Sequence, residues 1–211
     1  MRFRHLTGEN AFKRWDWVEF RYTPPPHDRR TESCRVHEES IHVIDHMPRS
    51  KRSRFLSPFI SRSISDAANR GNSLSLLHPI RPKFIIKSKS PQRIEREREA
   101  YKRAASQLTM FDKELAAIEP SPHDFRFQFE DADGRHDFAN ADWEVHAMYW
   151  NGLKRGQSEA ETLDWISNTF NEDYPKKGML FAVGNQAKRP QTWQLLGVLR
   201  VDLDTQGTLD L

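Results

Sequence analysis

The chain has 211 residues, of which 36% are hydrophobic and 30% are charged, and its formal net charge is +3. The length suits one ordinary domain or a small domain with an added segment, and the low apolar content argues against one core spanning the chain. No apolar run could span a membrane, the first residues lack a secretory signal, and a single cysteine excludes an internal disulfide. We therefore expect a cytoplasmic protein.

The charges are divided unevenly between the two halves of the chain. Residues 1–111 hold 23 Lys and Arg against 12 Asp and Glu, a net charge of +11, whereas residues 112–211 hold 10 against 18, a net charge of −8. Residues 47–93 are the most basic part, with 11 basic residues and one acid, Asp66. This asymmetry indicates a basic N-terminal region joined to an acidic body.

The first 30 residues contain one strand signal. Residues 14–22 are rich in aromatic and β-branched side chains, and the prolines at 24–26 end the pattern. Trp15 and Trp17 alternate with charged residues, which is typical of a half-buried strand. The same interleaving of Trp and Arg would also allow stacking on the bases of a single-stranded nucleic acid.

Residues 31–93 show the weakest signals for a fold. Residues 40–46 predict a short strand or one helical turn, and residues 55–64 a helical turn broken by Pro58. The segment 48–54 is basic and low in complexity, so we expect solvated coil there. Residues 84–86 predict an edge strand.

Residues 91–119 predict a long helix. Apolar residues recur every seven positions from Ile94 through Tyr101 and Leu108 to Leu115, and Pro91 and Pro120 flank the pattern. The apolar seam allows two uses: packing on the helix's own domain, or a homodimer formed through helix 92–118.

Residues 120–211 predict a compact α+β body. Strand 125–130, a tight turn at 131–134 and a returning strand form a hairpin, two further helices follow, and two strands at 179–183 and 193–203 complete it. Asp142 is the expected cap of one helix, and Ser158 with Glu161 forms a capping box for the next. The predicted fold class is therefore α+β. A basic, partly irregular N-terminal region (1–90) precedes C-terminal antiparallel hairpins packed with three helices (91–211).

The histidines near residue 40 are candidates for metal ligands. His37, His42 and His46 lie close together in the sequence, and imidazole is a common ligand of transition metals. On a helix, His42 and His46 would share one face; on a strand, they would be about 13 Å apart and could not share an ion. We expect no bound metal, and His42 and His46 are the candidates if one is present.

The acidic turn near residue 134 is a second candidate. Asp131, Asp133 and Asp137 surround Gly134, but the further oxygen ligands of a calcium loop are missing, and Asp-Gly is an ordinary hairpin turn. A metal-dependent nuclease or hydrolase would use this cluster or the three histidines.

The charge distribution leads to a hypothesis of nucleic-acid binding. We expect a non-enzymatic accessory protein without a cofactor, which binds DNA or RNA, or a nucleoprotein assembly, while its acidic C-terminal domain makes protein contacts. The residues proposed to contact phosphates without reading sequence are Arg49, Lys51, Arg52, Arg54, Lys83, Lys87, Lys89 and Arg93. The alternatives are the hydrolase and a protein–protein scaffold in which the basic and acidic halves dock on each other.

Overall fold

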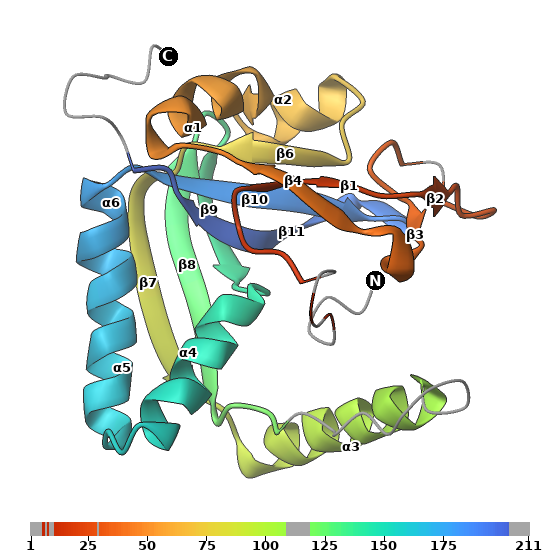
Figure 1. The fold of residues 1–211 in the computed structure, drawn as a ribbon. Coiled ribbons are helices and arrows are strands. Elements are labelled where there is room, and N and C mark those ends of the chain that lie inside the picture. The colour runs from red at the N-terminus through yellow and green to blue at the C-terminus, as the bar shows by residue number, and fades with distance from the viewer. Residues whose placement is uncertain (1–5, 7, 9–10, 29, 109–118, 203–211) are drawn as a thin grey trace.

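The computed structural model describes residues 6, 8, 11–28, 30–108 and 119–202, with residues 104–108 described by their backbone only. The described chain is a mixed α+β fold with mainly antiparallel sheets, which confirms the expected fold class (Figure 1). None of the described helices is long and apolar enough to cross a bilayer.

Two sheets form the centre of the molecule. The first contains β11 (Arg189–Arg200), β10 (Met179–Gln186), β6 (Leu74–Leu77) and β5 (Ile60–Ser61) in that order, with β5 parallel to β6. The second contains β7 (Ile80–Ser88), β8 (His123–Asp131) and β9 (Gly134–Ala139), all antiparallel. The predicted hairpin at residues 131–134 is the β8–β9 connection.

The core lies between these sheets. Phe127 and Phe129 of β8 both contact Phe181 of β10, with ring centroids 4.8 and 4.9 Å apart. Helices α4 (Trp143–Lys154) and α5 (Glu159–Asn168) pack against the same aromatic cluster through buried Tyr149 and Ile166. Because side chains alternate along a strand, the polar residues of β8 point to the other face of the three-stranded sheet.

Local signals explain the helices of this body. The Asp142 side chain accepts a hydrogen bond from the Glu144 amide, and the capping box of Ser158 and Glu161 is present at the start of α5. After α5 the chain continues through a π-helical turn (Thr169–Asp173) into α6 (Tyr174–Lys176). Both expected caps are thus confirmed.

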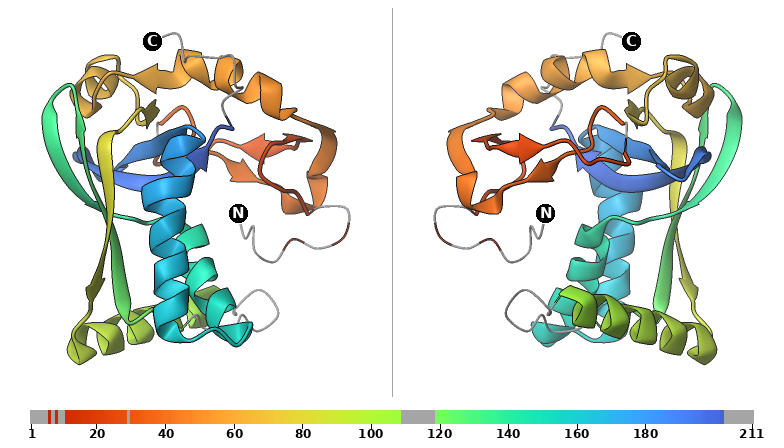
Figure 2. Two further views of the ribbon diagram at one scale, coloured as in Figure 1. Left: turned by 90° about the vertical axis from the view of Figure 1, so that its left-hand side faces the viewer. Right: turned by 90° about the vertical axis from the view of Figure 1, so that its right-hand side faces the viewer.

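The N-terminal residues form two small ribbons. Strand β1 (Asp16–Glu19) pairs with β4 (His42–His46), and β2 (Tyr22–Thr23) pairs with β3 (Arg35–Val36), with the short helix η3 (Glu38–Ser40) between β3 and β4. Helices α1 (Arg49–Leu56), η4 (Ser57–Phe59) and α2 (Ile64–Asn69) then run along one end of the molecule (Figure 2).

The expectation of solvated coil at residues 48–54 was wrong, because this segment begins α1. Arg52 and Leu56, four residues apart, form the buried side of the helix. Leu56 packs with Leu180 and Val201 of the C-terminal body. Contacts with distant residues therefore stabilise a helix whose own sequence is polar.

The predicted boundary between residues 90 and 91 does not follow the sheet pairing. Strand β6 pairs with β10, and β7 pairs with β8, so residues 74–88 belong to the sheets of the C-terminal body. Helix α3 (Pro91–Leu108) lies at the end of the molecule away from α1 (Figure 2). Residues 109–118 of the expected helix 91–119, including Leu115 of the seam proposed for a homodimer, lie outside the described residues.

Candidate nucleic-acid interface

The eight basic residues proposed as phosphate contacts lie in three separate places. Arg49, Lys51, Arg52 and Arg54 are on α1, Lys83 and Lys87 are on β7, and Lys89 and Arg93 are where β7 meets α3. They therefore do not form one continuous surface, and each group has to be considered by its own contacts.

Arg52 makes contacts inside the protein. Its Nη1 lies 2.8 Å from Oδ2 of Asp202, and its guanidinium lies over the ring of Trp15, 4.4 Å from the centroid. Burial lowers the pKa of Arg52, and the Asp202 carboxylate partly offsets that effect. Arg49 approaches the same carboxylate at 3.9 Å. We therefore assign Arg52 a structural role.

Lys89 and Arg93 are also paired. Lys89 Nζ lies 2.6 Å from Oε2 of Glu97, and Arg93 Nε lies 3.2 Å from Oε1 of the same residue. Arg93 also hydrogen-bonds to Asp124 at the start of β8. This network attaches α3 to the second sheet.

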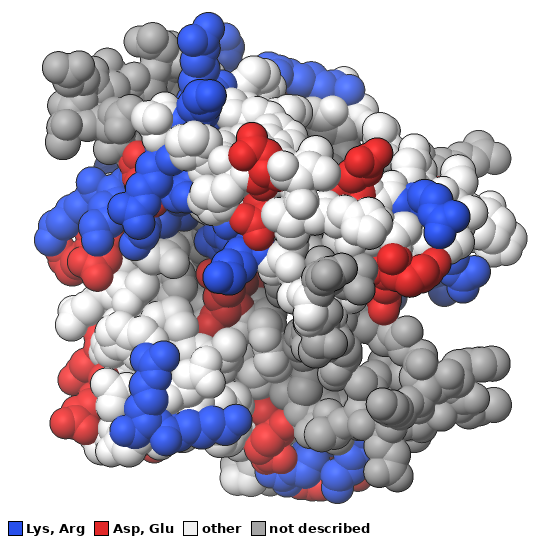
Figure 3. All heavy atoms as spheres, viewed as in Figure 1, with Lys and Arg blue, Asp and Glu red and all other residues white. Residues whose placement is uncertain are grey.

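Further arginines join the basic half to the acidic half. Arg14 Nη2 lies 2.6 Å from Oε1 of Glu144, and Arg14 Nη1 donates to the carbonyl of Val198 at 3.1 Å. Arg30 Nη1 donates to the carbonyl of Asn185 at 2.8 Å. Basic and acidic side chains are interspersed over the face seen in Figure 3. The basic half is thus folded onto the body.

Four of the eight predicted residues remain available. Lys51, Arg54, Lys83 and Lys87 are exposed, and none of them forms a salt bridge with another described residue. They divide into two pairs on different surfaces, one on α1 and one on β7.

The pair on α1 lies beside a row of exposed aromatic rings. The ring centroids of Trp17 and Phe55 are 5.2 Å apart, and those of Phe55 and Phe59 are 5.7 Å apart. These side chains are 41%, 39% and 55% exposed, respectively. We call Trp17, Lys51, Arg54, Phe55 and Phe59 together the α1 surface.

Helical periodicity brings the cations and rings of the α1 surface together. Lys51 and Phe55 are four residues apart and share one face, and Arg54 lies on the side of α1 opposite to buried Arg52 and Leu56. In the sequence, Trp17 belongs to the strand signal at 14–22, and Phe55 and Phe59 to the separate segment 55–64. Their contact joins strand β1 to α1 across more than thirty residues, so no local pattern predicts it.

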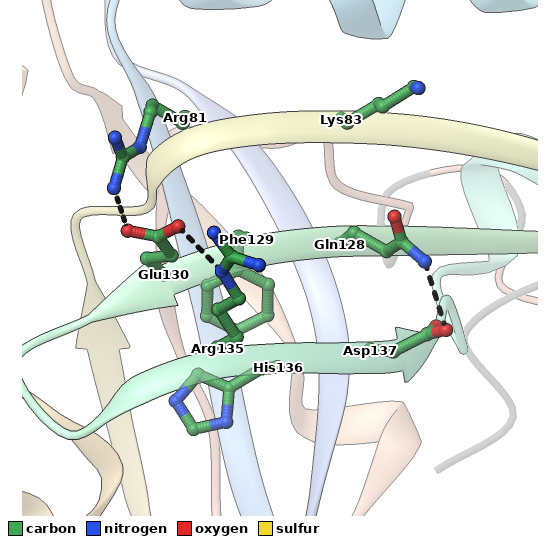
Figure 4. A pocket seen from close by; sticks show the side chains of 8 residues that line it. All are labelled: Arg81, Lys83, Gln128, Phe129, Glu130, Arg135, His136 and Asp137. Atoms are coloured by element: carbon green, nitrogen blue, oxygen red, sulfur yellow. Dashed lines mark hydrogen bonds and ion pairs between the residues drawn. The ribbon is translucent and has the colours of Figure 1, made fainter.

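The pair on β7 lies on the outer face of the three-stranded sheet. A hollow of about 440 Å³ on this face is lined by Arg81, Lys83, Gln128, Glu130, Arg135 and Asp137, among others. The carboxylate of Glu130 forms ion pairs with Arg81 on one side and with Arg135 on the other (Figure 4). Arg135 Nε lies 3.2 Å from Oε1 of Glu130. Lys83 extends away from this bridge.

Most of the cations that line this hollow form ion pairs with carboxylates. Hydrogen bonds from Arg81, together with those from Arg135, hold the pKa of Glu130 below its ordinary value. Burial opposes ionisation of Asp137, but hydrogen bonds from Arg126 and Gln128 lower its pKa overall. The outer sheet face is therefore a mixed-charge surface without exposed aromatic rings among its lining residues.

The histidine candidates are placed on a strand rather than on a helix. His42 and His46 are both on β4, so about 13 Å separates them along the strand. His46 Nδ1 lies 2.7 Å from Oδ1 of Asp16, and His37 Nδ1 lies 3.8 Å from Oε1 of Glu39. Within the described residues, no group of three or more His, Cys, Asp or Glu side chains is arranged to hold a metal ion.

The acidic turn is used as a cap. Asp131 Oδ2 accepts the amide of Ile64 at 3.2 Å, and Asp133 Oδ2 accepts the amide of Ser65 at 2.9 Å. These are the first amides of α2, where a carboxylate also compensates the helix dipole. Asp137, by contrast, pairs with Arg126 at 2.7 Å. The three carboxylates therefore have different partners.

Comparison with known proteins divides the chain at residue 60. Residues 1–60 match the model of a family described as Domain of unknown function (DUF8758), and residues 60–209 match one described as Domain of unknown function (DUF8757). No curated protein and no solved structure matches the chain. All residues of the α1 surface lie in the first region, and both sheets lie in the second. Because the second match covers more than half of the chain, the protein belongs to the family described as Domain of unknown function (DUF8757).

Proposed function

We propose that the protein is a non-enzymatic accessory protein that binds single-stranded nucleic acid through the α1 surface. The observation that carries this proposal is the exposed row of Trp17, Phe55 and Phe59 next to the unpaired cations Lys51 and Arg54. Aromatic rings stack on unpaired bases, and neighbouring cations neutralise the phosphates between those bases.

The geometry favours a single strand over a duplex. The bases of a duplex are stacked on one another and cannot reach a row of rings on a protein surface, whereas each unpaired base offers a free face. Stacking is tolerant of sequence, since every base has such a face. The binding that we propose is therefore not sequence-specific.

One carboxylate lies close to this surface. Asp45 is the pairing partner of Trp17 in the β1–β4 ribbon, so both side chains are on the same face of the ribbon. A negative charge there repels phosphate and moderates the affinity. The acidic C-terminal body would remain available for contacts with a protein partner.

A protein–protein scaffold is the second candidate. The observation that favours it is the docking of the two halves through Arg14 with Glu144 and Arg52 with Asp202, which takes cations out of solvent. A scaffold would leave the aromatic row to a protein partner. As a scaffold, the protein would have no higher affinity for nucleic acid at low salt than a protein without a basic surface.

Fluorescence anisotropy with labelled oligonucleotides tests the proposal. We expect a single-stranded DNA or RNA to bind more tightly than the corresponding duplex, and the affinity to fall steeply as NaCl rises from about 50 to about 300 mM, because counterions are released on binding. A flat salt response would favour the scaffold, and a preference for the duplex would contradict stacking of unpaired bases on the α1 surface.

A further inference from the structure

The carboxylate of Asp45 stands beside the first ring of the α1 surface. Asp45 on β4 is the direct pairing partner of Trp17 on β1. The neighbouring pair, Asp16 with His46, lies on the opposite face of the ribbon, where the two side chains are 2.7 Å apart. Directly opposed residues of an antiparallel pair have Cβ atoms about 4.5–5.5 Å apart. The Asp45 carboxylate is therefore next to the Trp17 indole, at one end of the row of rings.

Asp45 has unused capacity to accept hydrogen bonds. Its Oδ1 accepts the amide of His46 at 2.7 Å, which orients the carboxylate. Among the described residues, no group donates to Oδ2 and no cation forms a salt bridge with Asp45, whose side chain is exposed. An ionised carboxylate has about four acceptor sites on its two oxygens. Both oxygens of Asp45 can therefore accept from a ligand.

The indole of Trp17 offers open ring surface next to this carboxylate. It is 41% exposed, and it meets Phe55 edge to face, with an interplanar angle of 78°. An edge-to-face pair does not sandwich either ring, so a base can stack on an open face. Side chains stand roughly perpendicular to a strand ribbon, so Trp17 and Asp45 project side by side. A base stacked on Trp17 thus has one edge within reach of Asp45.

The charges around the row of rings match the polarity of a nucleotide. At the Phe55 end, Lys51 and Arg54 of α1 are exposed cations. At the Trp17 end, the strand partner is the acid Asp45. A nucleotide has an anionic phosphate on one side and a base edge with N–H donors on the other. This arrangement favours phosphates beside α1 and a base edge directed towards the ribbon.

Guanine matches a carboxylate better than the other bases do. Its Watson–Crick edge carries two adjacent donors, the N1–H and the N2 amino group, which can reach both carboxylate oxygens. Adenine and cytosine offer one amino donor next to an acceptor nitrogen, and thymine and uracil place one N–H between two carbonyls. Those neighbouring lone pairs repel a carboxylate, because an ionised carboxylate can only accept. A preference for guanine follows from the paired donors, in addition to stacking.

We propose that Asp45 selects guanine at the position stacked on Trp17. This inference rests on the proposed binding of a single strand, and it adds a preference at one position to stacking that by itself reads no sequence. The N1–H and N2–H groups of guanine donate to the Asp45 carboxylate, while Lys51 and Arg54 neutralise the neighbouring phosphates. Asp45 repels the phosphates of every strand, and only guanine gains a contact that offsets this repulsion.

Fluorescence anisotropy with short oligothymidine strands tests the selection. The strands differ only in one central base, which is guanine, adenine, hypoxanthine or 1-methylguanine, and adenine controls for the stacking of a purine. We expect the guanine strand to bind the wild type about tenfold more tightly than the adenine strand, the order of discrimination given by a bidentate contact. Hypoxanthine lacks the N2 amino group and should lie between the two. In 1-methylguanine the N1 donor is lost, so its strand should bind no better than the adenine strand.

Two variants of the ribbon separate recognition from charge. Asp45→Asn keeps an oxygen for the His46 amide, removes the charge and offers an amino group to the guanine donors. Glu19→Gln is the matched control, because Glu19 is two residues from Trp17 on the same face of β1 and pairs with His42. Both variants should bind the all-thymine strand more tightly than the wild type, since each loses a negative charge. Only Asp45→Asn should lose the preference for guanine, to within about twofold.

Competition identifies the source of the guanine. Free guanosine lacks the phosphates that Lys51 and Arg54 contact, so it should displace the labelled strand only at concentrations far above those of an unlabelled guanine strand. Displacement by guanosine and by the unlabelled strand at equal concentrations would overturn a strand as the source.

Three results would overturn selection by Asp45. They are equal affinities of the wild type for the guanine and adenine strands, equal affinities for guanine and 1-methylguanine, and a guanine preference that survives in Asp45→Asn. Circular dichroism shows whether this variant folds, and if it does not, the series of bases in the wild type decides. These results leave the proposed function intact as long as Trp17→Ala weakens strand binding. If no single strand binds, the proposed function fails, and the selection of guanine fails with it.

Discussion

The guanidinium of Arg52 and the carboxylate of Asp202, 150 positions apart in the chain, form an ion pair with 2.8 Å between Nη1 and Oδ2. Their side chains are only 8% and 14% exposed. Asp202 and Trp15, the residues on either side of the guanidinium, both have positive φ angles, 55° and 75°. This strained, buried contact joins the region 1–60 to the end of the C-terminal body.

Arg52→Ala should therefore destabilise the protein more than alanine at any other basic residue of α1. Removing Arg52 takes the closest cation of the described residues from Oδ2 of Asp202, although Arg200 still pairs with Oδ1 at 2.7 Å. We expect a cost of about 2 kcal/mol in the free energy of unfolding, the size of a lost hydrogen bond to a charged group. Urea denaturation followed by circular dichroism measures this change. Arg49→Ala is the matched control, because Arg49 is exposed and its contact with the same carboxylate is longer, at 3.9 Å. Equal effects of the two changes would contradict a special role for Arg52.

Gly152→Ala should destabilise the contact between α4 and α5. A Cβ at Gly152 would lie 2.5 Å from Cγ2 and 2.7 Å from Oγ1 of Thr162, which is fully buried. Such overpacking costs about 1–3 kcal/mol. Adding Thr162→Ser removes the methyl group while keeping the hydroxyl that donates to Ser158, so thermal denaturation should show partial recovery. If the stability does not recover, the Thr162 methyl group is not the source of the strain.

Asp131→Ala should loosen the start of α2 without changing the response to metal ions. The carboxylate of Asp131 accepts the Ile64 amide and the amide of Asp133, so its loss should cost about 1–3 kcal/mol of stability. Thermal denaturation with and without millimolar Mg²⁺ makes the comparison. A Tm that rises with Mg²⁺ in the wild type, and does not rise in the variant, would instead support the metal-dependent hydrolase.

Tyr149→Phe should raise the pKa of Glu159 towards its ordinary value of 4.5, because the Tyr149 hydroxyl is the largest cause lowering it. A folded-state pKa below 4.5 adds stability above that pH, and this stability is lost as the pH falls through the folded-state pKa. The variant should therefore be less stable than the wild type at neutral pH, with a difference that shrinks in acid. Carboxyl-carbon NMR titration measures the pKa directly, and an unchanged value would reject this assignment.

Local chemistry predicts the C-terminal body well. The caps at Asp142 and Ser158 and the alternating phenylalanines of β8 are short-range patterns, and the structure has the corresponding elements. The segment that became α1 has no such pattern. Its buried side carries an arginine whose partners, Trp15 and Asp202, are distant in the chain, so only the folded protein shows why it is helical.

The candidate site could be predicted only in part. Composition pointed to residues 47–93, and Lys51 and Arg54 within it are indeed exposed. Composition alone cannot separate an exposed cation from a paired one, so Arg52 and Lys89 were selected on the same grounds. The row from Trp17 to Phe59 depends on the packing of β1 against α1, which a pattern of neighbouring residues does not contain.

Removing equal charge from two surfaces tests the central claim most directly. One variant carries Lys51→Gln and Arg54→Gln on α1, and the other carries Lys83→Gln and Lys87→Gln on β7, with circular dichroism to confirm that both fold. We predict that the first variant binds a single-stranded oligonucleotide at least about tenfold more weakly than the wild type. Its plot of log affinity against log salt should be less steep, with a slope smaller in magnitude by about one to two. The second variant should match the wild type in both measurements. Equal losses in both variants, or a loss only in the second, would contradict binding at the α1 surface.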